Sequence, residues 1–114
     1  MEIIKATEGL SKKDIYKMVN DPAIKKIKEG SGLEVTLISY VRYMDTNNSG
    51  NEVDLLAINT DQGIFATNSK TFIEDFERII EQLGEPGDEW TGVIKIIEDI
   101  SKNGRTFYQC GLVD

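Results

Sequence analysis

The hydrophobic positions between residues 69 and 84 recur every three or four residues, as they do on one face of an α-helix. This apolar stripe consists of Phe72, Phe76, Ile79, Ile80 and Leu83. Ser69 or Thr71 offers a hydroxyl that can cap the start of a helix. Gly84 and Pro86 follow the stripe and are typical of a helix end. The pattern therefore predicts a helix over residues 69–84.

Alternation of apolar and polar residues predicts strands on both sides of this helix. Three segments precede it, at residues 33–44, 52–60 and 64–67, and two follow it, at residues 90–101 and 105–113. The first segment is rich in β-branched and aromatic residues, which favour strands. Strict alternation would place Leu33, Val35, Leu37, Ser39, Val41 and Tyr43 on one face, and Glu34, Thr36, Ile38, Tyr40, Arg42 and Met44 on the other.

Asn103-Gly104 separates the last two strand segments and predicts a two-residue type I′ turn, because both central positions of that turn need positive φ. Such a turn pairs Lys102 with Arg105, Ile100 with Phe107, and Asp99 with Tyr108. One face of the hairpin would then belong to the core and carry Ile94, Ile96, Ile100, Phe107 and Val113. The opposite face would carry Lys95, Asp99, Tyr108, Ile97, Cys110 and Leu112.

The first 30 residues form a separate extension in this scheme. Residues 1–7 fit either a short strand or an ordered arm. Residues 11–29 predict two short helices, with Ser11 as the first N-cap and Asn20-Asp21-Pro22 as the break between them. Two short helices that pack on a sheet are the common case, and a DNA-reading helix pair is the alternative.

Three antiparallel strands, a helix and a two-stranded hairpin are the element order of the OB-fold, a small five-stranded barrel. We therefore predict a mainly β protein of one domain, residues 1–114, with the helix between strands three and four. Residues 31–114 would form the barrel and residues 1–30 the two-helix extension. An open α+β sheet with the same elements is the rival. OB barrels bind ligands on the face of strands two and three, framed by the loops between strands one and two and between strands four and five. These loops are here Asp45–Asn51 and Ser101–Arg105.

Several segments resemble the small single-stranded DNA-binding proteins of tailed phages and prophages of Gram-positive bacteria. They are Glu2-Ile-Ile-Lys-Ala-Thr7, Leu10-Ser-Lys-Lys-Asp-Ile-Tyr16, Phe65-Ala-Thr-Asn-Ser-Lys-Thr-Phe72 and Ser101-Lys-Asn-Gly-Arg-Thr-Phe107. The resemblance implies an OB-fold protein that coats single strands during replication or recombination. Many such proteins carry an acidic C-terminal tail that recruits replication or recombination proteins, whereas this chain ends Cys110-Gly-Leu-Val-Asp114, within or just past a predicted strand.

Charge and composition narrow the class of protein. The net charge is −7, with seven Lys and five acids in residues 1–30 against six Lys or Arg and fifteen acids in residues 31–114. The acidic body argues against a nonspecific duplex-DNA coat. The single Cys110 suits a reducing cytoplasm. No apolar run approaches the ~20 residues of a membrane span, and the start of the chain lacks a signal-peptide pattern.

No enzyme motif is visible, since the chain has no histidine, no cysteine pair and no phosphate-binding glycine loop. We therefore expect no cofactor and no metal. The acid pairs Glu74/Asp75 and Glu98/Asp99 could ligate Mg²⁺, but solvated surface is the better interpretation. Single-strand binding needs aromatic rings for stacking and cations along the backbone. The candidates are Tyr40, Arg42, Phe65, Lys95, Lys102, Arg105 and Tyr108, of which Phe65 fits the core equally well.

These observations favour a non-enzymatic, sequence-tolerant single-stranded DNA-binding protein. The alternative is a protein-interaction module, either a β-barrel adaptor or an acidic inhibitor of a host factor. An enzyme with a carboxylate-bound metal is the weakest option. The sequence leaves the oligomeric state open between a monomer and a homodimer.

Overall fold

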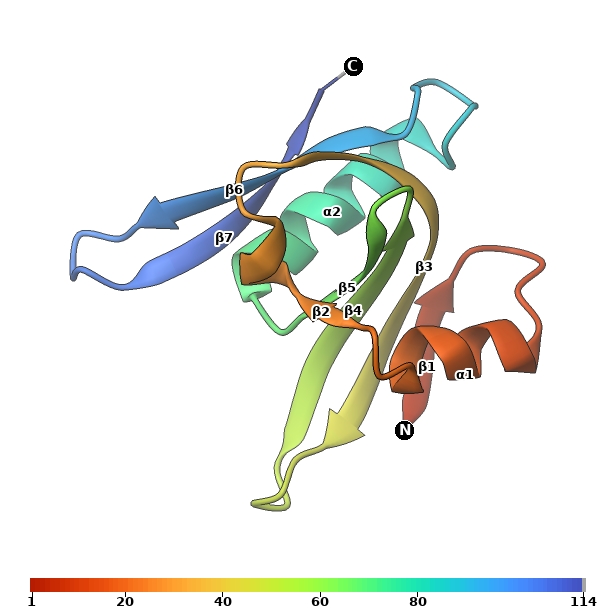
Figure 1. Ribbon diagram of the computed structural model, residues 1–114, viewed down its shortest axis with the longest axis horizontal. Helices are drawn as coiled ribbons and strands as arrows, with labels where there is room; N and C mark the ends of the chain where they lie inside the picture. Colours follow the sequence, from red (N-terminus) through yellow and green to blue (C-terminus); the bar gives the residue numbers. More distant parts are fainter. Residues whose placement is uncertain (114) are drawn as a thin grey trace.

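The computed structural model describes residues 1–113 and shows a curled β-sheet that holds one helix in its hollow and a second helix on its outer side (Figure 1). The elements in chain order are β1 (Glu2–Ala6), α1 (Lys12–Asn20), β2 (Lys25–Lys26), the 3₁₀ helix η1 (Ile27–Gly30), β3 (Glu34–Thr46), β4 (Glu52–Thr60), β5 (Gly63–Thr67), α2 (Lys70–Leu83), β6 (Val93–Ile100) and β7 (Thr106–Leu112).

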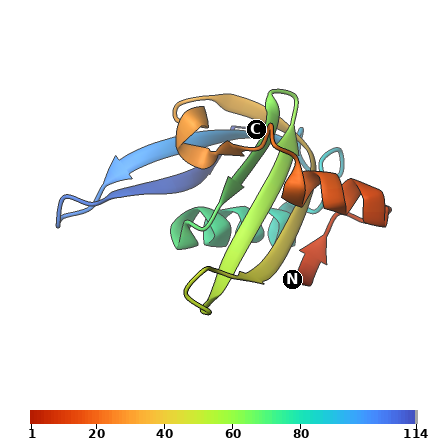
Figure 2. The same cartoon turned by 60° about the horizontal axis from the view of Figure 1, so that its bottom comes forward.

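The strands lie in the order β2-β5-β4-β3-β6-β7, with β1 paired to β3. All neighbours are antiparallel except β2 and β5, so the sheet is mixed. The long strand β3 connects the two halves, because residues 34–36 pair with β6 and residues 37–46 pair with β4. The sheet bends along β3 into a half-barrel (Figure 2). Within the described residues no ladder joins β5 to β7, so the half-barrel is open between them.

A β-bulge at Ile38 interrupts the alternation of β3. Leu37 pairs with Thr60, and Ser39 pairs with Asn59, the adjacent residue of β4. Ile38 is therefore an extra residue in β3, and its side chain is exposed. Because side chains alternate with a period of two, one extra residue exchanges the two faces of the strand beyond it.

The bulge corrects the predicted faces of the strand. Leu37 points into the hollow of the half-barrel, and after the bulge Tyr40 does so too. Val41 and Tyr43, predicted to share a face with Leu37, belong instead to a second apolar cluster on the other side of the sheet. Both faces of β3 are thus covered along its second half.

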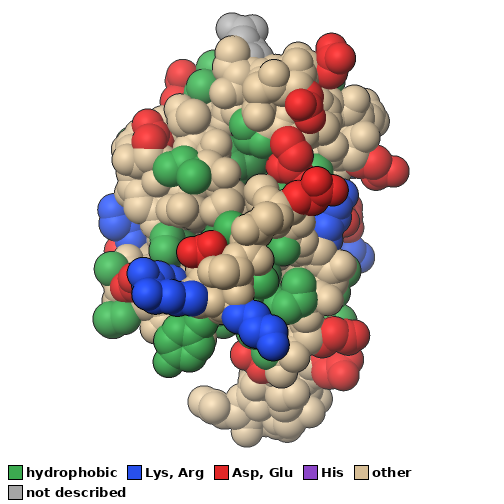
Figure 3. Space-filling view, turned by 90° about the vertical axis from the view of Figure 1, so that its right-hand side faces the viewer, with side chains coloured by type: hydrophobic (Ala, Val, Ile, Leu, Met, Phe, Trp, Pro, Cys, Tyr) green, Lys and Arg blue, Asp and Glu red, His purple; other side chains and the backbone are tan. Residues whose placement is uncertain are grey.

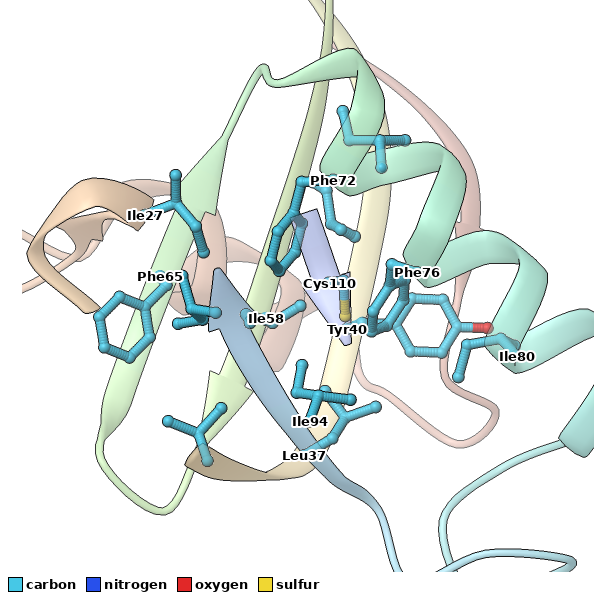
Figure 4. Close-up of a cluster of buried hydrophobic side chains, with 14 of the residues drawn as sticks. Ile27, Leu37, Tyr40, Ile58, Phe65, Phe72, Phe76, Ile80, Ile94 and Cys110 are labelled. Carbon is cyan, nitrogen blue, oxygen red and sulfur yellow. The ribbon is translucent and has the colours of Figure 1, made fainter. Parts of the chain in front are cut away.

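The helix α2 fills the hollow of the half-barrel and confirms the strongest sequence prediction. Ser69 is its N-cap and accepts a hydrogen bond from the Phe72 N–H at 3.4 Å. Gly84 ends it with φ of 79°, a left-handed backbone that favours glycine. Figure 4 shows the core packed between α2 and the sheet. Its largest fully buried side chains include Tyr40, Phe65, Phe72, Phe76, Leu56, Ile58, Ile94 and Ile96.

The helix α1 covers the second cluster on the outer face of the sheet. Ser11 and Asp14 form the reciprocal capping box that starts it, with both hydrogen bonds at 3.1 Å. Met18 is buried against Val41, Tyr43 and Ala57. The first predicted helix of the N-terminal extension is therefore present.

The second predicted helix is absent from residues 22–29. The Asp21 carboxylate accepts the Ala23 N–H at 2.8 Å and holds a turn rather than a helix start. Lys25 and Lys26 then pair in parallel with β5, and only the single 3₁₀ turn η1 follows. The pairing satisfies backbone groups at the β5 edge and brings Ile27 into the core, which the local pattern could not reveal.

The β6–β7 hairpin has a different turn and register from the prediction. The Ser101 N–H donates to the Arg105 carbonyl at 2.8 Å, so the loop has three residues rather than two. Gly104 has φ of 79°, and no residue other than glycine has positive φ among residues 1–113. Asn103 therefore cannot take the first position of a type I′ turn. A single left-handed Gly at the end of a three-residue loop is the next commonest hairpin.

The shift exchanges the faces of β7. Glu98 now pairs with Tyr108 and Ile96 with Cys110, so Tyr108 and Cys110 lie on the same face as the buried Ile96. Ile100, predicted to be core, is 67% exposed. Burial, with Asp75 nearby, raises the pKa of the Cys110 thiol to about 12.

The predicted fold class is confirmed only at the coarser level of a mainly β, barrel-like protein with helices. The sheet has seven strands rather than five, and α2 lies between the fifth and sixth strands rather than between the third and fourth. The segment predicted as a strand or an arm is the strand β1, which pairs with residues 41–44 of β3.

Candidate nucleic-acid interface

A groove of about 410 Å³ opens where the half-barrel is not closed, between the end of β5 and the inner face of β7. Lys26, Ile27 and Lys28 line it from β2 and η1. Tyr108 faces them from β7. The floor and far wall come from β4, from β5 and from the residues that lead into α2, namely Leu55, Ala66, Thr67, Asn68 and Ser69.

Among the described residues no Asp or Glu lines this groove, although the chain carries a net charge of −7. The side chains of Lys26 and Lys28 are exposed. The nearby Glu29 carboxylate accepts the backbone N–H of Lys26 at 2.7 Å and so caps the start of η1. Many of the acids lie elsewhere, and three of them line a hollow on the outer face of α2: Glu74, Glu77 and Glu81. The groove is therefore a locally basic strip on an acidic protein.

Tyr108 is held at the groove by contacts at both ends. Its hydroxyl donates to the Glu98 carboxylate at 3.2 Å, and its carbonyl accepts the Ser69 hydroxyl at 3.3 Å. Partial burial and the hydrogen bond to Glu98 raise the pKa of the phenol above its ordinary value. The ring is half-buried, and the exposed Ile100 lies next along the same face of the hairpin. A neutral ring beside an apolar side chain is a surface on which a base can stack.

A second hollow, of about 320 Å³, continues the groove toward the loop between β3 and β4. The two hollows share Leu55 and Asn68. The side-chain oxygen of Asn47 accepts the backbone N–H groups of Ser49 and Asn51, which shapes that loop. The two hollows together run from Tyr108 of β7 to the loop between β3 and β4, where Asp45 is among the lining residues. Of the two loops predicted to frame a binding face, Asp45–Asn51 contributes to this lining and Ser101–Arg105 does not.

Two of the predicted stacking residues belong to the core instead. Tyr40 is 2% exposed, packs edge-on against Phe76 with ring centroids 5.2 Å apart, and donates to Glu85 at 3.4 Å. Burial, with the Glu85 carboxylate beside it, raises the pKa of Tyr40 to about 12. Phe65 is also buried, with the Lys25 ammonium 5.5 Å from its ring centre. Neither ring offers a free face to a base.

Arg42 is a structural cation rather than a free one. Its side chain is 13% exposed, and its guanidinium contacts Glu77 of α2 at 2.6 Å and Asp54 of β4 at 3.2 Å. It thereby ties the helix to the sheet. Both partners are about half exposed to water, so the two contacts contribute only modestly to stability.

Replacing Arg42 by Gln should lower the free energy of unfolding by roughly 1 kcal/mol. It should leave unchanged the slope of log affinity for oligo-dT against log salt, because the guanidinium is already paired. Arg105→Gln is the matched control, since it removes an exposed cation and should reduce the slope by about 0.7. An equal decrease of the salt slope in both variants would mean that Arg42 contacts the nucleic acid.

The remaining predicted cations lie at different places. Lys95 is exposed but lies on the face of β6 opposite to Tyr108, beside Glu34 of β3. Lys102 and Arg105 are exposed at the tip of the β6–β7 hairpin, which projects from the body of the molecule (Figure 2). The tip cations therefore belong to the hairpin that forms one wall of the groove, whereas Lys95 does not.

Two groove lysines and the exposed isoleucine near the groove were missed from the sequence. Lys26 and Lys28 fell within the predicted second short helix, and Ile100 was predicted to be core. Ile24 and Ile27 are three residues apart, a spacing that fits a helix, so the local pattern gave no signal that residues 25–26 are extended. Their placement depends on the long-range pairing of β2 with β5.

Neither a metal site, nor a membrane-spanning helix, nor similarity to a known protein helps to identify the function of the described residues. Among residues 1–113 no group of three or more Cys, Asp or Glu side chains is placed to hold a metal ion. Within the same residues no helix is long and apolar enough to cross a bilayer. Neither a family model, nor a curated protein, nor a solved structure matches the chain.

Proposed function

We propose that this protein binds single-stranded nucleic acid, in the first place DNA, along the groove between its two hairpins, and so coats strands exposed in replication or recombination. The observation that carries the proposal is the absence of lining acids, among the described residues, from the groove that holds Lys26, Lys28 and Tyr108. In a protein of charge −7, a groove lined by two lysines and, within residues 1–113, by no Asp or Glu favours a polyanion at that place, and the Glu98 carboxylate at its edge is bound to the Tyr108 hydroxyl.

The strand order supports an OB-fold for the main part of the chain. Without β1 and β2, the remaining order is β5-β4-β3-β6-β7, with α2 between β5 and β6. This is the order of an OB barrel opened between its third and fifth strands. The groove then occupies the region beside the second and third strands where OB barrels bind oligonucleotides.

The groove has both elements of sequence-tolerant binding. Stacking on an aromatic ring tolerates any base, because every base has a π-face, and contributes about 1–3 kcal/mol per base. Tyr108, with Ile100 beside it, offers such a surface. Lys26 and Lys28 on the opposite wall, with Lys102 and Arg105 at the hairpin tip, offer charges to the phosphates. We therefore expect affinity without base readout.

The test is a fluorescence anisotropy titration of labelled oligo-dT at low salt, repeated at increasing salt. Four cations at the groove and hairpin tip predict a slope of log affinity against log salt of about −2 to −3. Tyr108→Leu should weaken binding about 5- to 150-fold with an unchanged slope. The double variant Lys26→Gln/Lys28→Gln should reduce the slope by about 1.4.

Lys95→Gln is the matched charge control, because Lys95 is exposed on the face of β6 opposite to Tyr108 and does not line the groove. It should bind as the wild type does. Circular dichroism and melting temperature must show that each variant is folded, since Tyr108 is half-buried. If the wild type binds no oligo-dT even at low salt, the groove is not a nucleic-acid site and a protein partner becomes the better proposal.

A further inference from the structure

We infer that the outer face of α1 is a second contact surface for the same single strand, centred on Tyr16 and flanked by Lys12 and Lys13. The inference rests on the proposed function and extends it, because it takes the strand beyond the groove. The ligand class is a single-stranded polynucleotide long enough to reach from the groove to α1.

Tyr16 differs from every other aromatic residue of the described chain. Its side chain is 67% exposed, whereas the remaining tyrosines, the phenylalanines and Trp90 are buried or half-buried. An exposed tyrosine on a helix that already buries Met18, Ile15 and Val19 on its other side contributes nothing to the core. It does offer an open π-face, which is what a base needs for stacking.

The cations around Tyr16 are available to phosphates. Lys12 and Lys13 precede Tyr16 by one helical turn, so their side chains lie on the same side of α1. Both are exposed, and within residues 1–113 no acid forms a salt bridge with Lys12, Lys13 or Lys17.

The single acid of α1, Asp14, is committed to the Ser11 capping box at the start of the helix. Its hydrogen bonds with Ser11 and the nearby lysines lower the pKa of its carboxyl group, so it is charged at neutral pH. The side of α1 that carries Lys12, Lys13 and Tyr16 is therefore aromatic and basic, whereas Lys17 lies in a hollow that Glu8, Asp14 and Asp21 also line.

Continuity with the groove argues for one ligand at both places. Leu55 lines the groove and also packs against the cluster beneath α1. The chain runs from the end of α1 at Asn20 through one short turn to Lys25 and Lys26 at the groove wall. Figure 3 shows the face that carries β1 and α1, where Lys or Arg side chains lie beside hydrophobic ones in the lower left part and acidic side chains gather along the upper right margin.

The test compares wild type and Tyr16→Leu on two lengths of labelled oligo-dT, about 6 nucleotides, within the range of about 4–16 that one OB domain covers, and about 20 nucleotides, beyond it. The long strand should lose about 5- to 150-fold in affinity and the short strand should lose none. Tyr16→Phe should restore the affinity, because it keeps the ring. Lys12→Gln/Lys13→Gln should reduce the salt slope of the long strand by about 1.4.

The controls separate this inference from the proposed function. Lys95→Gln removes an exposed lysine on the face of β6 opposite to Tyr108 and should leave the binding of both strands unaffected. If the wild type binds neither strand, the proposed function fails. If the wild type binds both strands and Tyr16→Leu binds the long one equally well, the inference alone fails, and the α1 face is left to a protein partner. Photocrosslinking of an iodouracil-containing long strand to the peptide with Tyr16 should support it directly.

Discussion

Replacing Tyr40 by alanine is expected to lower the free energy of unfolding by about 3–5 kcal/mol, which is typical of a large aromatic side chain removed from a core. The ring is 2% exposed and packs against Phe76 of α2, with an angle of 70° between the ring planes. Its removal leaves a cavity between β3 and α2 and takes away the hydroxyl that donates to Glu85. Urea denaturation followed by circular dichroism measures the loss.

Tyr40→Phe is the matched control, because it keeps the ring and removes only the hydroxyl. It should cost about 1 kcal/mol, the usual net value of one hydrogen bond. Both variants, measured at a temperature where they are folded, should bind oligo-dT with wild-type affinity. A folded Tyr40→Ala protein with an unchanged melting temperature and weakened binding would mean that Tyr40 lies at the surface and contacts the ligand.

Tyr40 was predicted to face a ligand and is buried in the core, which shows how much of the fold hydrophobic periodicity can predict. The positions of the long strand, of its partner and of α2 follow from local patterns, and they are correct within a few residues. The bulge at Ile38 has no comparable signal, because an isoleucine fits a regular strand as well as a bulge. One extra residue then reverses the facing of everything beyond it, including Arg42.

The hairpin shows the same limit at a turn. Asn103-Gly104 correctly marks the turn, but the dipeptide fits a two-residue loop and the end of a three-residue loop equally well. The one-residue difference decides whether Tyr108 faces the groove or the opposite side. Packing favours the observed register, because it buries Cys110 against the core and brings Tyr108 to the same face.

Residues of the candidate interface could be predicted from the sequence only where they come from a single hairpin. Tyr108, Lys102 and Arg105 come from a single hairpin and were identified from the sequence. Lys26 and Lys28 reach the groove because residues 25–26 pair with residues 65–66, some forty residues later in the chain. Long-range pairing of a two-residue strand leaves no periodic trace, so half of the basic wall could not be derived.

A substitution of Gly30, at the end of η1, is expected to cause the second large loss of stability. A Cβ atom on this buried glycine would lie 2.7 Å from Cδ1 of Ile96 and 2.8 Å from Cε1 of Phe65. Both neighbours are themselves fully buried, so neither can move freely. Gly30→Val should therefore destabilise the protein by about 1–3 kcal/mol through overpacking.

The location of Gly30 adds a functional consequence to this loss. The following residues hold β6, since Gly32 N–H donates to the Ile96 carbonyl at 2.7 Å and Ile96 N–H donates to the Leu33 carbonyl at 2.9 Å. A shift of Gly30 should thus displace Lys28 on the groove wall and weaken oligo-dT binding even where the variant is folded. Gly30→Ala should show a smaller loss of stability, and the exposed neighbour Ser31→Ala should change it by less than about 0.5 kcal/mol. A Gly30→Val protein as stable as Ser31→Ala would mean that η1 does not pack between β5 and β6.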